Sequence, residues 1–154
     1  MTDRYLLDSN ILIYLSNRSA QHRPVAIAAV EKLHAQGAKL SVCSQSIVEM
    51  RTVLTRPATS PNGIGMTPVD VKAEIVDYLK VFALQPDGPA LFPLWRDLTD
   101  AAGTIGKQNH DARLLAAAMA GGCSHLLTFN ESDFKQFSAF TTVQIVNPAT
   151  VLKQ

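Results

Sequence analysis

Residues 5–14 read YLLDSNILIY, and this stretch decides the fold that the rest of the chain completes. Residues 5–7 form a short apolar run that ends abruptly at Asp8. Such a run is typical of a strand that is buried on both faces of a sheet. The segment 10–16 that follows is expected to form a first short helix. The pattern therefore predicts a buried strand with an acidic residue directly at its end.

Short apolar runs and helical stripes alternate along the remainder of the chain. Further strands are expected at residues 40–43, 81–84, 125–129 and 143–146. Helices are expected to begin at or near Pro24, Ser44, Pro68, Pro93 and Asn109, with Ser44, Thr67 and Asn109 as N-caps, and a helical turn is expected over 134–137. This alternation predicts an α/β fold with a mostly parallel sheet of four to five strands, flanked by helices. In such folds the loops after the strands share one edge, where ligands bind.

The bulk properties of the chain narrow the possible classes. Its 154 residues with 47% apolar content suit one compact domain over residues 1–154. The net charge of +1 shows no basic excess, although a local basic rim would suffice to bind nucleic acid. Cys43 and Cys123 are far apart and are expected to be small buried apolar residues. The first ten residues lack a signal-peptide pattern, and the apolar stretch 114–123 is too short to span a bilayer, so we expect a cytoplasmic protein.

Four of the thirteen acidic residues lie at positions unusual for solvated charges. They are Asp8 after the first strand, Glu49 inside an apolar helical run, Asp111 in the first turn of the helix before the fourth strand, and Asp133 just beyond that strand. Each one alone is readily explained as a turn, cap or helix-dipole residue. A parallel sheet, however, would bring them to one edge, and gathered like charges need a cation or raised pKa values. A hard divalent ion, Mg²⁺ or Mn²⁺, meets this need, since the four histidines show no zinc-ligand spacing.

Four segments, in their order and spacing, resemble the PIN domain, and within it the VapC-like toxins of bacterial toxin–antitoxin pairs. These segments are LLDSNILIY at 6–14, SQSIVEMRTVLTRP at 44–57, NHDARLLAAAM at 109–119 and LLTFNESDF at 126–134. The resemblance covers nearly the whole chain. It implies a parallel sheet flanked by helices and RNA cleavage by acids that bind Mg²⁺ or Mn²⁺. It also implies a homodimer and an antitoxin partner whose peptide blocks the acidic groove.

The resemblance also implies which residues form the site. The family's first three acids fall on Asp8, Glu49 and Asp111. Many relatives carry the fourth acid directly after the Thr-x pair of the fourth strand, where this chain has Asn130. Relatives with this variant use the acid three residues later, which is Asp133 here. The fourth position is therefore assigned to Asp133, with Asn130 as a further source of a metal-binding oxygen.

Phosphodiester hydrolysis by a metal ion gives each residue an expected role. Asp8 and Asp111 are the expected direct ligands, and Glu49 would either bind the metal or act as a general base. Asp133 would hold a second ion or a water of the first. Support for the acids is expected from Ser9, Asn10, Thr128 and Asn130, and contacts to the RNA backbone from Arg51, Arg56, Lys107 and Arg113.

Three other functions fit parts of the pattern. A catalytically weak or inactive PIN domain would act as an RNA- or protein-binding module, and Asn130 keeps this alternative open. A phosphatase of the haloacid-dehalogenase type would use Asp8 as its nucleophile, but such sites usually carry a second Asp where this chain has Asn10. A receiver-like phosphoacceptor would need its Asp directly after a central strand, whereas Asp87 lies in a loop beyond the third strand candidate.

Overall fold

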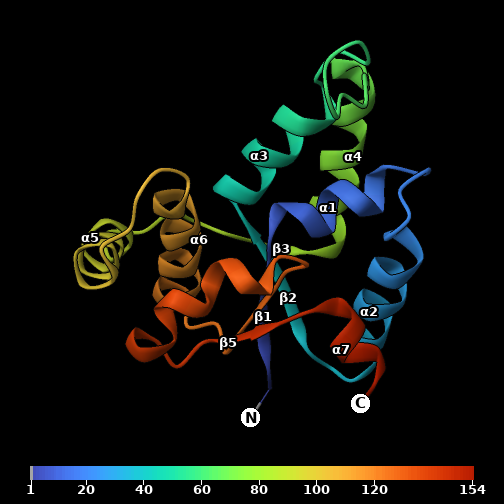
Figure 1. The fold of residues 1–154 in the computed structure, drawn as a ribbon. Coiled ribbons are helices and arrows are strands. Elements are labelled where there is room, and N and C mark those ends of the chain that lie inside the picture. The colour runs from blue at the N-terminus through green and yellow to red at the C-terminus, as the bar shows by residue number, and fades with distance from the viewer. Residues whose placement is uncertain (1) are drawn as a thin grey trace.

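A computed structural model describes residues 2–154, and at its centre is a five-stranded sheet in which all neighbouring strands are parallel (Figure 1). The strands are β1 (Arg4–Leu7), β2 (Lys39–Cys43), β3 (Ala83–Gln85), β4 (His125–Leu127) and β5 (Gln144–Val146). Their order across the sheet is β3-β2-β1-β4-β5. The expectation of a parallel sheet with four to five strands is confirmed, and the number is five.

The order of the strands places β1 in the middle of the sheet. The chain runs outward from β1 through β2 to β3, and then returns to add β4 and β5 on the other side of β1. The direction of winding therefore reverses between β1 and β4, which is where ligands bind in open parallel sheets. Leu7 pairs with Leu127 at this point, and the N–H of Asp8 donates to the Leu127 carbonyl at 3.0 Å.

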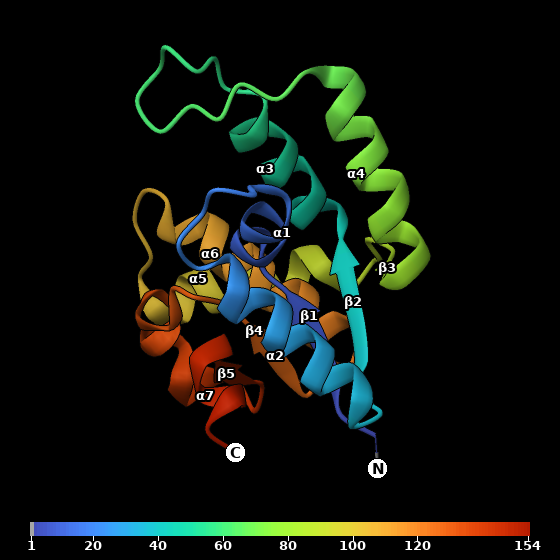
Figure 2. The same ribbon diagram turned by 90° about the vertical axis from the view of Figure 1, so that its right-hand side faces the viewer.

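Helices cover both faces of the sheet (Figures 1 and 2). One face carries α5 (Leu91–Ala102), α6 (Gln108–Ala120) and the 3-10 helix η1 (Glu131–Phe140). The other carries α1 (Ser9–Ser16), α2 (Arg23–Ala35), α3 (Ser44–Leu54), α4 (Pro68–Val81) and α7 (Pro148–Leu152). Because side chains alternate along a strand, Leu6 packs into the core under α5 and α6, while Tyr5 and Leu7 pack into the core on the other face.

Helices α3 and α4 form an arm that projects beyond the sheet (Figure 2). The loop between them, residues 55–67, closes on itself through two backbone hydrogen bonds. The N–H of Gly65 donates to the Arg56 carbonyl at 2.8 Å, and the N–H of Met66 donates to the Leu54 carbonyl at 2.9 Å. The loop 55–67, which is rich in proline and glycine, is therefore a hydrogen-bonded connection between two helices and not a boundary between domains.

Two of the three expected N-caps are wrong. Thr67 caps α4 as expected, with its side chain accepting from the N–H of Asp70 at 3.1 Å. Ser44, in contrast, is the first residue of α3, and its hydroxyl donates to Asp87 at 2.6 Å. Asn109 lies inside α6, where its amide donates to the Gly106 carbonyl at 3.0 Å. In both cases the polar side chain hydrogen-bonds to another group, Asp87 or the Gly106 carbonyl, and does not cap the helix.

Several element boundaries also differ from the expectation, and one helix was not expected. Strand β4 ends at Leu127 and not at residue 129, and the expected turn at 134–137 is the longer 3-10 helix η1. Strand β3 begins at Ala83 and not at Val81, because α4 continues through Val81. Helix α5 begins at Leu91, two residues before Pro93, so the proline lies in the first turn, where its missing N–H is not needed. Helix α7, which packs against α2, was not expected from the sequence.

Both cysteines are buried and free, as expected, with Cys43 at the end of β2 and Cys123 before β4. Within residues 2–154 no helix is both long enough and apolar enough to cross a membrane.

The two faces of the sheet predict how its leucines respond to truncation. Leu126 in β4 is fully buried, so Leu126→Ala should lower the free energy of unfolding by about 2–5 kcal/mol through lost burial and a cavity. Leu84 in β3 is 54% exposed, so Leu84→Ala should change it by less than about 0.5 kcal/mol. Urea denaturation of both variants measures the difference. Equal losses in the two variants would contradict this packing.

Candidate active site

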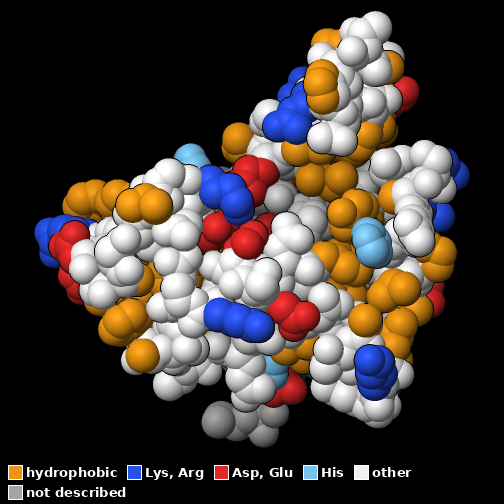
Figure 3. Space-filling view, in the orientation of Figure 1, with side chains coloured by type: hydrophobic (Ala, Val, Ile, Leu, Met, Phe, Trp, Pro, Cys, Tyr) orange, Lys and Arg blue, Asp and Glu red, His pale blue; other side chains and the backbone are white. Residues whose placement is uncertain are grey.

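Four acidic side chains lie along the carboxyl edge of the sheet, where they form two pairs. Asp8 follows β1 directly, Glu49 lies in α3, and Asp111 and Asp133 lie in the first turns of α6 and η1. Figure 3 shows carboxylates gathered beside a Lys or Arg side chain, in the hollow between the places where Figure 1 draws α3 and α6. The fold therefore brings the four expected acids to one edge of the sheet, and their roles at the site stay predictions.

The Asp8 carboxylate is the most enclosed of the four, with the residue only 8% exposed. Its Oδ1 atom accepts from the N–H of Ser9 at 2.6 Å, which also makes Asp8 the N-cap of α1. Its Oδ2 atom accepts from the hydroxyl of Thr128 at 2.8 Å and, more weakly, from the amide of Asn10 at 3.4 Å. Thr128 is fully buried at the end of β4, so Asp8 is held from both β1 and β4.

A single hydroxyl joins Asp8 to Glu49. The Ser9 Oγ atom lies 2.9 Å from Glu49 Oε2 and 3.3 Å from Asp8 Oδ1. A hydroxyl group has one proton, so it serves one of the two carboxylates at a time. The two carboxylates therefore lie close together and share one donor.

The ammonium group of Lys107 joins the other two acids. Its Nζ atom lies 3.2 Å from Asp133 Oδ2 and 3.4 Å from Asp111 Oδ2. The Lys107 side chain is 72% exposed, whereas that of Asp111 is 19% exposed, so the cation reaches into the site from solvent. The four acids thus form two bridged pairs.

The pKa values show that the two pairs influence each other. Burial raises the pKa of Asp8 to about 6, and the nearby charge of Glu49 adds to this, while hydrogen bonds from Thr128 and Ser9 oppose it. Burial also raises the pKa of Asp111, which the ammonium of Lys107 lowers and the charges of Asp133 and Glu49 raise further. Glu49 acts on both Asp8 and Asp111, so it lies electrostatically between the pairs.

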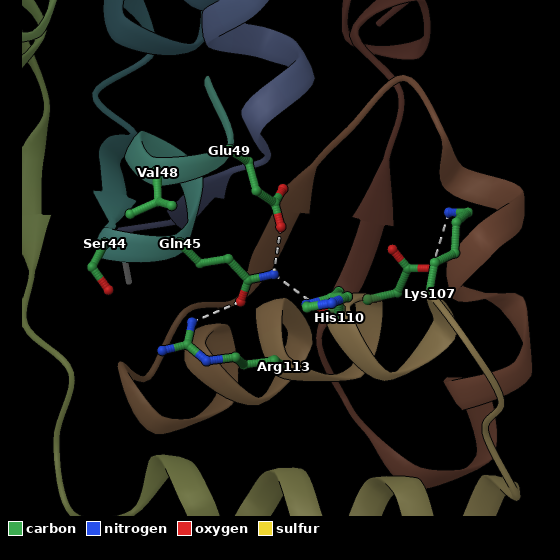
Figure 4. A pocket seen from close by; sticks show the side chains of 8 residues that line it. Ser44, Gln45, Val48, Glu49, Lys107, His110 and Arg113 are labelled. Atoms are coloured by element: carbon green, nitrogen blue, oxygen red, sulfur yellow. Dashed lines mark hydrogen bonds and ion pairs between the residues drawn. The ribbon is translucent and has the colours of Figure 1, made fainter. Parts of the chain in front are cut away.

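Sequence reasoning missed one residue of this site, Gln45. Its Nε2 atom donates to Glu49 Oε1 and to the His110 carbonyl, both at 2.9 Å, and its Oε1 atom accepts from Arg113 Nη1 at 2.8 Å (Figure 4). These residues, with Lys107, line a cleft of about 570 Å³ beside the acids. The available signal was the spacing of Gln45 and Glu49, four residues apart on one helix and therefore on one face.

The other residues that were expected to support the acids or to contact RNA differ in how close they lie to the site. Asn10 donates to Thr128 Oγ1 at 3.1 Å, in addition to its contact with Asp8. Asn130 contributes its backbone N–H, which donates to Thr128 Oγ1 at 3.0 Å, and within residues 2–154 its side chain makes no hydrogen bond. Lys107 and Arg113 line the acidic cleft, whereas Arg51 lines a separate cleft between α3 and α4.

The donor chemistry of the site fits a hard divalent cation. All four acids offer carboxylate oxygens, and the Ser9 hydroxyl contacts both Asp8 and Glu49. In the part of the chain from residue 2 to 154, no three His, Cys, Asp or Glu side chains are grouped closely enough to form a ready-made metal cluster. Mg²⁺ is usually bound by one or two carboxylates and several waters, so either bridged pair has the donors that this ion uses.

The fold and this edge together define a class: a single α/β domain with an all-parallel sheet and an acidic cleft at its carboxyl end. The profile of the PIN domain family matches residues 5–139, and the chain belongs to this family. A search of curated protein sequences found no match.

Several solved structures share the fold at low sequence identity. One is a VapBC2 complex from Rickettsia felis bound to promoter DNA, with a TM-score of 0.66, 18% identity, and coverage of 94% of this chain and 98% of the other. A toxin–antitoxin complex from Klebsiella pneumoniae has a TM-score of 0.62 and 21% identity over 94% of this chain and 97% of the other. VapC20 from Mycobacterium tuberculosis, a sarcin–ricin-loop-cleaving toxin, has a TM-score of 0.61 and 16% identity over 91% and 98%.

The raised pKa of Asp8 predicts that this acid destabilises the fold at neutral pH. The folded protein keeps the Asp8 proton up to a pH of about 6, whereas the unfolded chain loses it near 3.8, and this difference corresponds to about 3 kcal/mol. The destabilisation is complete above the folded pKa and fades as the pH falls toward the unfolded value. With EDTA present, Asp8→Asn should therefore raise the free energy of unfolding by about 1–3 kcal/mol at pH 7.5.

Urea denaturation of wild type and Asp8→Asn at two pH values measures this effect. The gain should shrink by more than half at about pH 4.5, because the folded wild type is then largely protonated at Asp8. Asp97→Asn, whose side chain is 75% exposed on α5, is the matched control and should show no gain. A loss of stability for Asp8→Asn at pH 7.5 would contradict the burial penalty.

Proposed function

We propose that this protein is a metal-dependent endoribonuclease that hydrolyses RNA phosphodiester bonds with Mg²⁺ or Mn²⁺. The observation that carries the proposal is the meeting of Asp8 and Glu49, bridged by Ser9, with Asp111 and Asp133, bridged by Lys107. Such a concentration of carboxylates beside an open cleft has no role in packing the core. The membership of the PIN family supports a nuclease or hydrolase function for this site.

Each residue of the site has a part in the proposed reaction. A bound divalent ion would supply a Lewis acid and an activated water. Asp8 and Asp111 are its proposed ligands, with Thr128 and Ser9 holding Asp8 in position by hydrogen bonds. Glu49 would bind the same ion or accept the proton of the attacking water, and Asp133 would hold a second ion or a bound water.

The cations of the cleft would admit a polyanion to an acidic site. Lys107 and Arg113 line the same cleft as Glu49 and Asp111. Without them, the phosphates of RNA would be repelled by the carboxylates at close range. We therefore propose that these two cations contact the RNA backbone next to the cleaved bond.

We further propose that the protein is the toxin of a VapBC-type pair, with an antitoxin protein as its partner and a homodimer as its own assembly. The structural similarity to VapBC and other toxin–antitoxin complexes supports the antitoxin partner. The similarity to VapC20, described as cleaving the sarcin–ricin loop, supports RNA as the substrate. We take the domain to extend over residues 1–154, because β5 and α7 pack against β4 and α2 beyond the matched residues 5–139.

One observation, at Asn130, favours an alternative function. Within residues 2–154 the side chain of Asn130 makes no hydrogen bond. The resemblance to the PIN family implies an acid at this position in many relatives. This fits a catalytically weak or inactive PIN domain that binds RNA or protein. The haloacid-dehalogenase alternative has lost its support, because the family match assigns Asp8 to a different fold.

A cleavage assay on structured RNAs tests the proposed activity. Purified wild-type protein should cleave RNA with Mg²⁺ or Mn²⁺ and not with EDTA, because the acids need a cation to act on a phosphate. Asp8→Asn and Asp111→Asn should each lower the cleavage rate at least about 100-fold, by loss of a metal ligand. Asp97→Asn, on the exposed face of α5, should cleave at the wild-type rate.

Two results would overturn the proposal. One is cleavage that is unchanged by EDTA and by Asp8→Asn, since a contaminating nuclease would then explain it. The other is the absence of metal-dependent cleavage from protein that is folded by circular dichroism, which would favour the binding-module alternative.

The toxin assignment predicts an effect on living cells. Induced expression of the wild-type chain in bacteria that lack its antitoxin should arrest growth, because cleavage of an essential RNA stops translation. Expression of Asp8→Asn to the same protein level should leave growth unchanged, and Asp97→Asn should arrest growth as the wild type does. Growth curves with immunoblots measure this. Normal growth of cells that express an active wild-type nuclease would contradict the toxin assignment but not the nuclease activity.

A further inference from the structure

We infer that Gln45 is a positioning residue that fixes the Glu49 carboxylate for metal binding, and that Arg113 acts through Gln45. The inference rests on the proposed function, because it concerns how one of the proposed metal-binding acids is held. Within residues 2–154, Glu49 is the one acid of the site that hydrogen-bonds to the Gln45 side chain, which is only 8% exposed at the start of α3. Its role would therefore be to orient Glu49 and not to bind the metal itself.

The orientation of the Gln45 amide is determined by its three partners. At one end lie two acceptors, Glu49 Oε1 and the His110 carbonyl oxygen, each at 2.9 Å. At the other end lies a donor, Nη1 of Arg113, at 2.8 Å. A flipped amide would set oxygen against two oxygens and nitrogen against a guanidinium, so the NH₂ group must face Glu49.

This amide also connects the two helices that carry candidate ligands. Glu49 lies on α3, while the His110 carbonyl belongs to α6 directly before Asp111. One NH₂ group donates to both, so it fixes the Glu49 carboxylate relative to the first turn of α6. A metal site needs its ligands fixed to within a fraction of an ångström, and residues next to the ligands supply that precision.

The donors around Glu49 leave room for a cation. Gln45 donates to Oε1 and Ser9 donates to Oε2, so each oxygen of Glu49 has one hydrogen bond. A carboxylate has about four positions for acceptance, which leaves one free on each oxygen. Two neutral donors thus orient the charge of Glu49 without neutralising it.

Arg113 is held in turn from the far side. Its Nη2 atom lies 3.5 Å from Asp87 Oδ2, and the hydroxyl of Ser44 donates to the same oxygen at 2.6 Å. The guanidinium therefore lies between Asp87 and Gln45 and keeps the amide in its orientation. Figure 4 shows this order from Arg113 through Gln45 to Glu49.

Mn²⁺ binding in the absence of RNA tests the inference separately from catalysis. Titration calorimetry and the electron paramagnetic resonance of free Mn²⁺ give the affinity. Gln45→Met, which keeps the length of the side chain, should weaken Mn²⁺ binding about 10- to 100-fold, as loss of a ligand's hydrogen-bond partner does. Arg113→Met should weaken it less, and the double variant should bind no worse than Gln45→Met. Gln21→Met, at an exposed position before α2, is the control and should bind as the wild type does.

The Mn²⁺ affinity of folded protein separates positioning from a general effect on the fold. A merely structural role would lower the melting temperature of the variants, while the protein that remains folded would bind Mn²⁺ as tightly as the wild type does. Wild-type affinity in folded Gln45→Met overturns the inference for Gln45, and additive losses overturn the dependence of Arg113 on Gln45. A wild type that binds no Mn²⁺ and cleaves no RNA refutes the proposed function instead, so the two failures are distinguishable.

A second measurement serves if Gln45→Met does not fold. In the wild type the side-chain NH₂ signals of Gln45 should shift in nitrogen–proton correlation spectra when Mg²⁺ is added. The reason is that a cation bound to Glu49 changes the charge on the carboxylate to which this NH₂ group donates. The side-chain signals of Gln21 should stay in place. Gln45 signals that stay in place while the backbone signal of Asp8 moves would overturn the inference.

Discussion

The parallel pairing of β1 with β2 on one side and with β4 on the other is the constraint on which the site depends. Parallel strands end at the same edge, so each residue that follows a strand is delivered to one surface. Asp8 comes from β1 and Thr128 from β4, and they hydrogen-bond although 120 positions separate them in the chain. Helices α3 and α6 start at the same edge and add Glu49 and Asp111. Four distant segments thus become neighbours through one sheet.

The carboxylates at the edge of the sheet lower the free energy of unfolding. A carboxylate as enclosed as Asp8 loses most of its hydration, and the charge of Glu49 lies close by. At Asp8 the chain limits this cost with hydrogen bonds from Thr128, Ser9 and Asn10. The ammonium of Lys107 offsets the charges of Asp111 and Asp133. Within residues 2–154 each buried side-chain nitrogen or oxygen has a hydrogen-bond partner. The strain is therefore electrostatic and confined to one edge, as is common where function requires an unfavourable arrangement.

The sequence predicted those parts that depend on local pattern. An apolar run ending in an acid identified β1 and Asp8, and the cap–proline–acid order at Thr67 identified the start of α4. It could not predict contacts between distant segments. Gln45 meets its partners 65 and 68 positions away, and Ser44 gives its hydroxyl to Asp87 instead of capping α3. The metal roles of the four acids stay predictions, since proximity alone does not assign them.

The long separation between Asp8 and Thr128 has a consequence for the order of events during protein synthesis. Residue 8 leaves the ribosome early, but its partner at residue 128 follows only after 120 more residues. Contacts so distant in sequence form late, because closing the long intervening loop costs chain entropy. Until β4 joins β1, the Asp8 carboxylate lacks Thr128 and the neighbouring acids of α6 and η1. An incomplete chain on the ribosome would therefore carry no assembled acidic edge, and the proposed site would form only after β4 has left the ribosome.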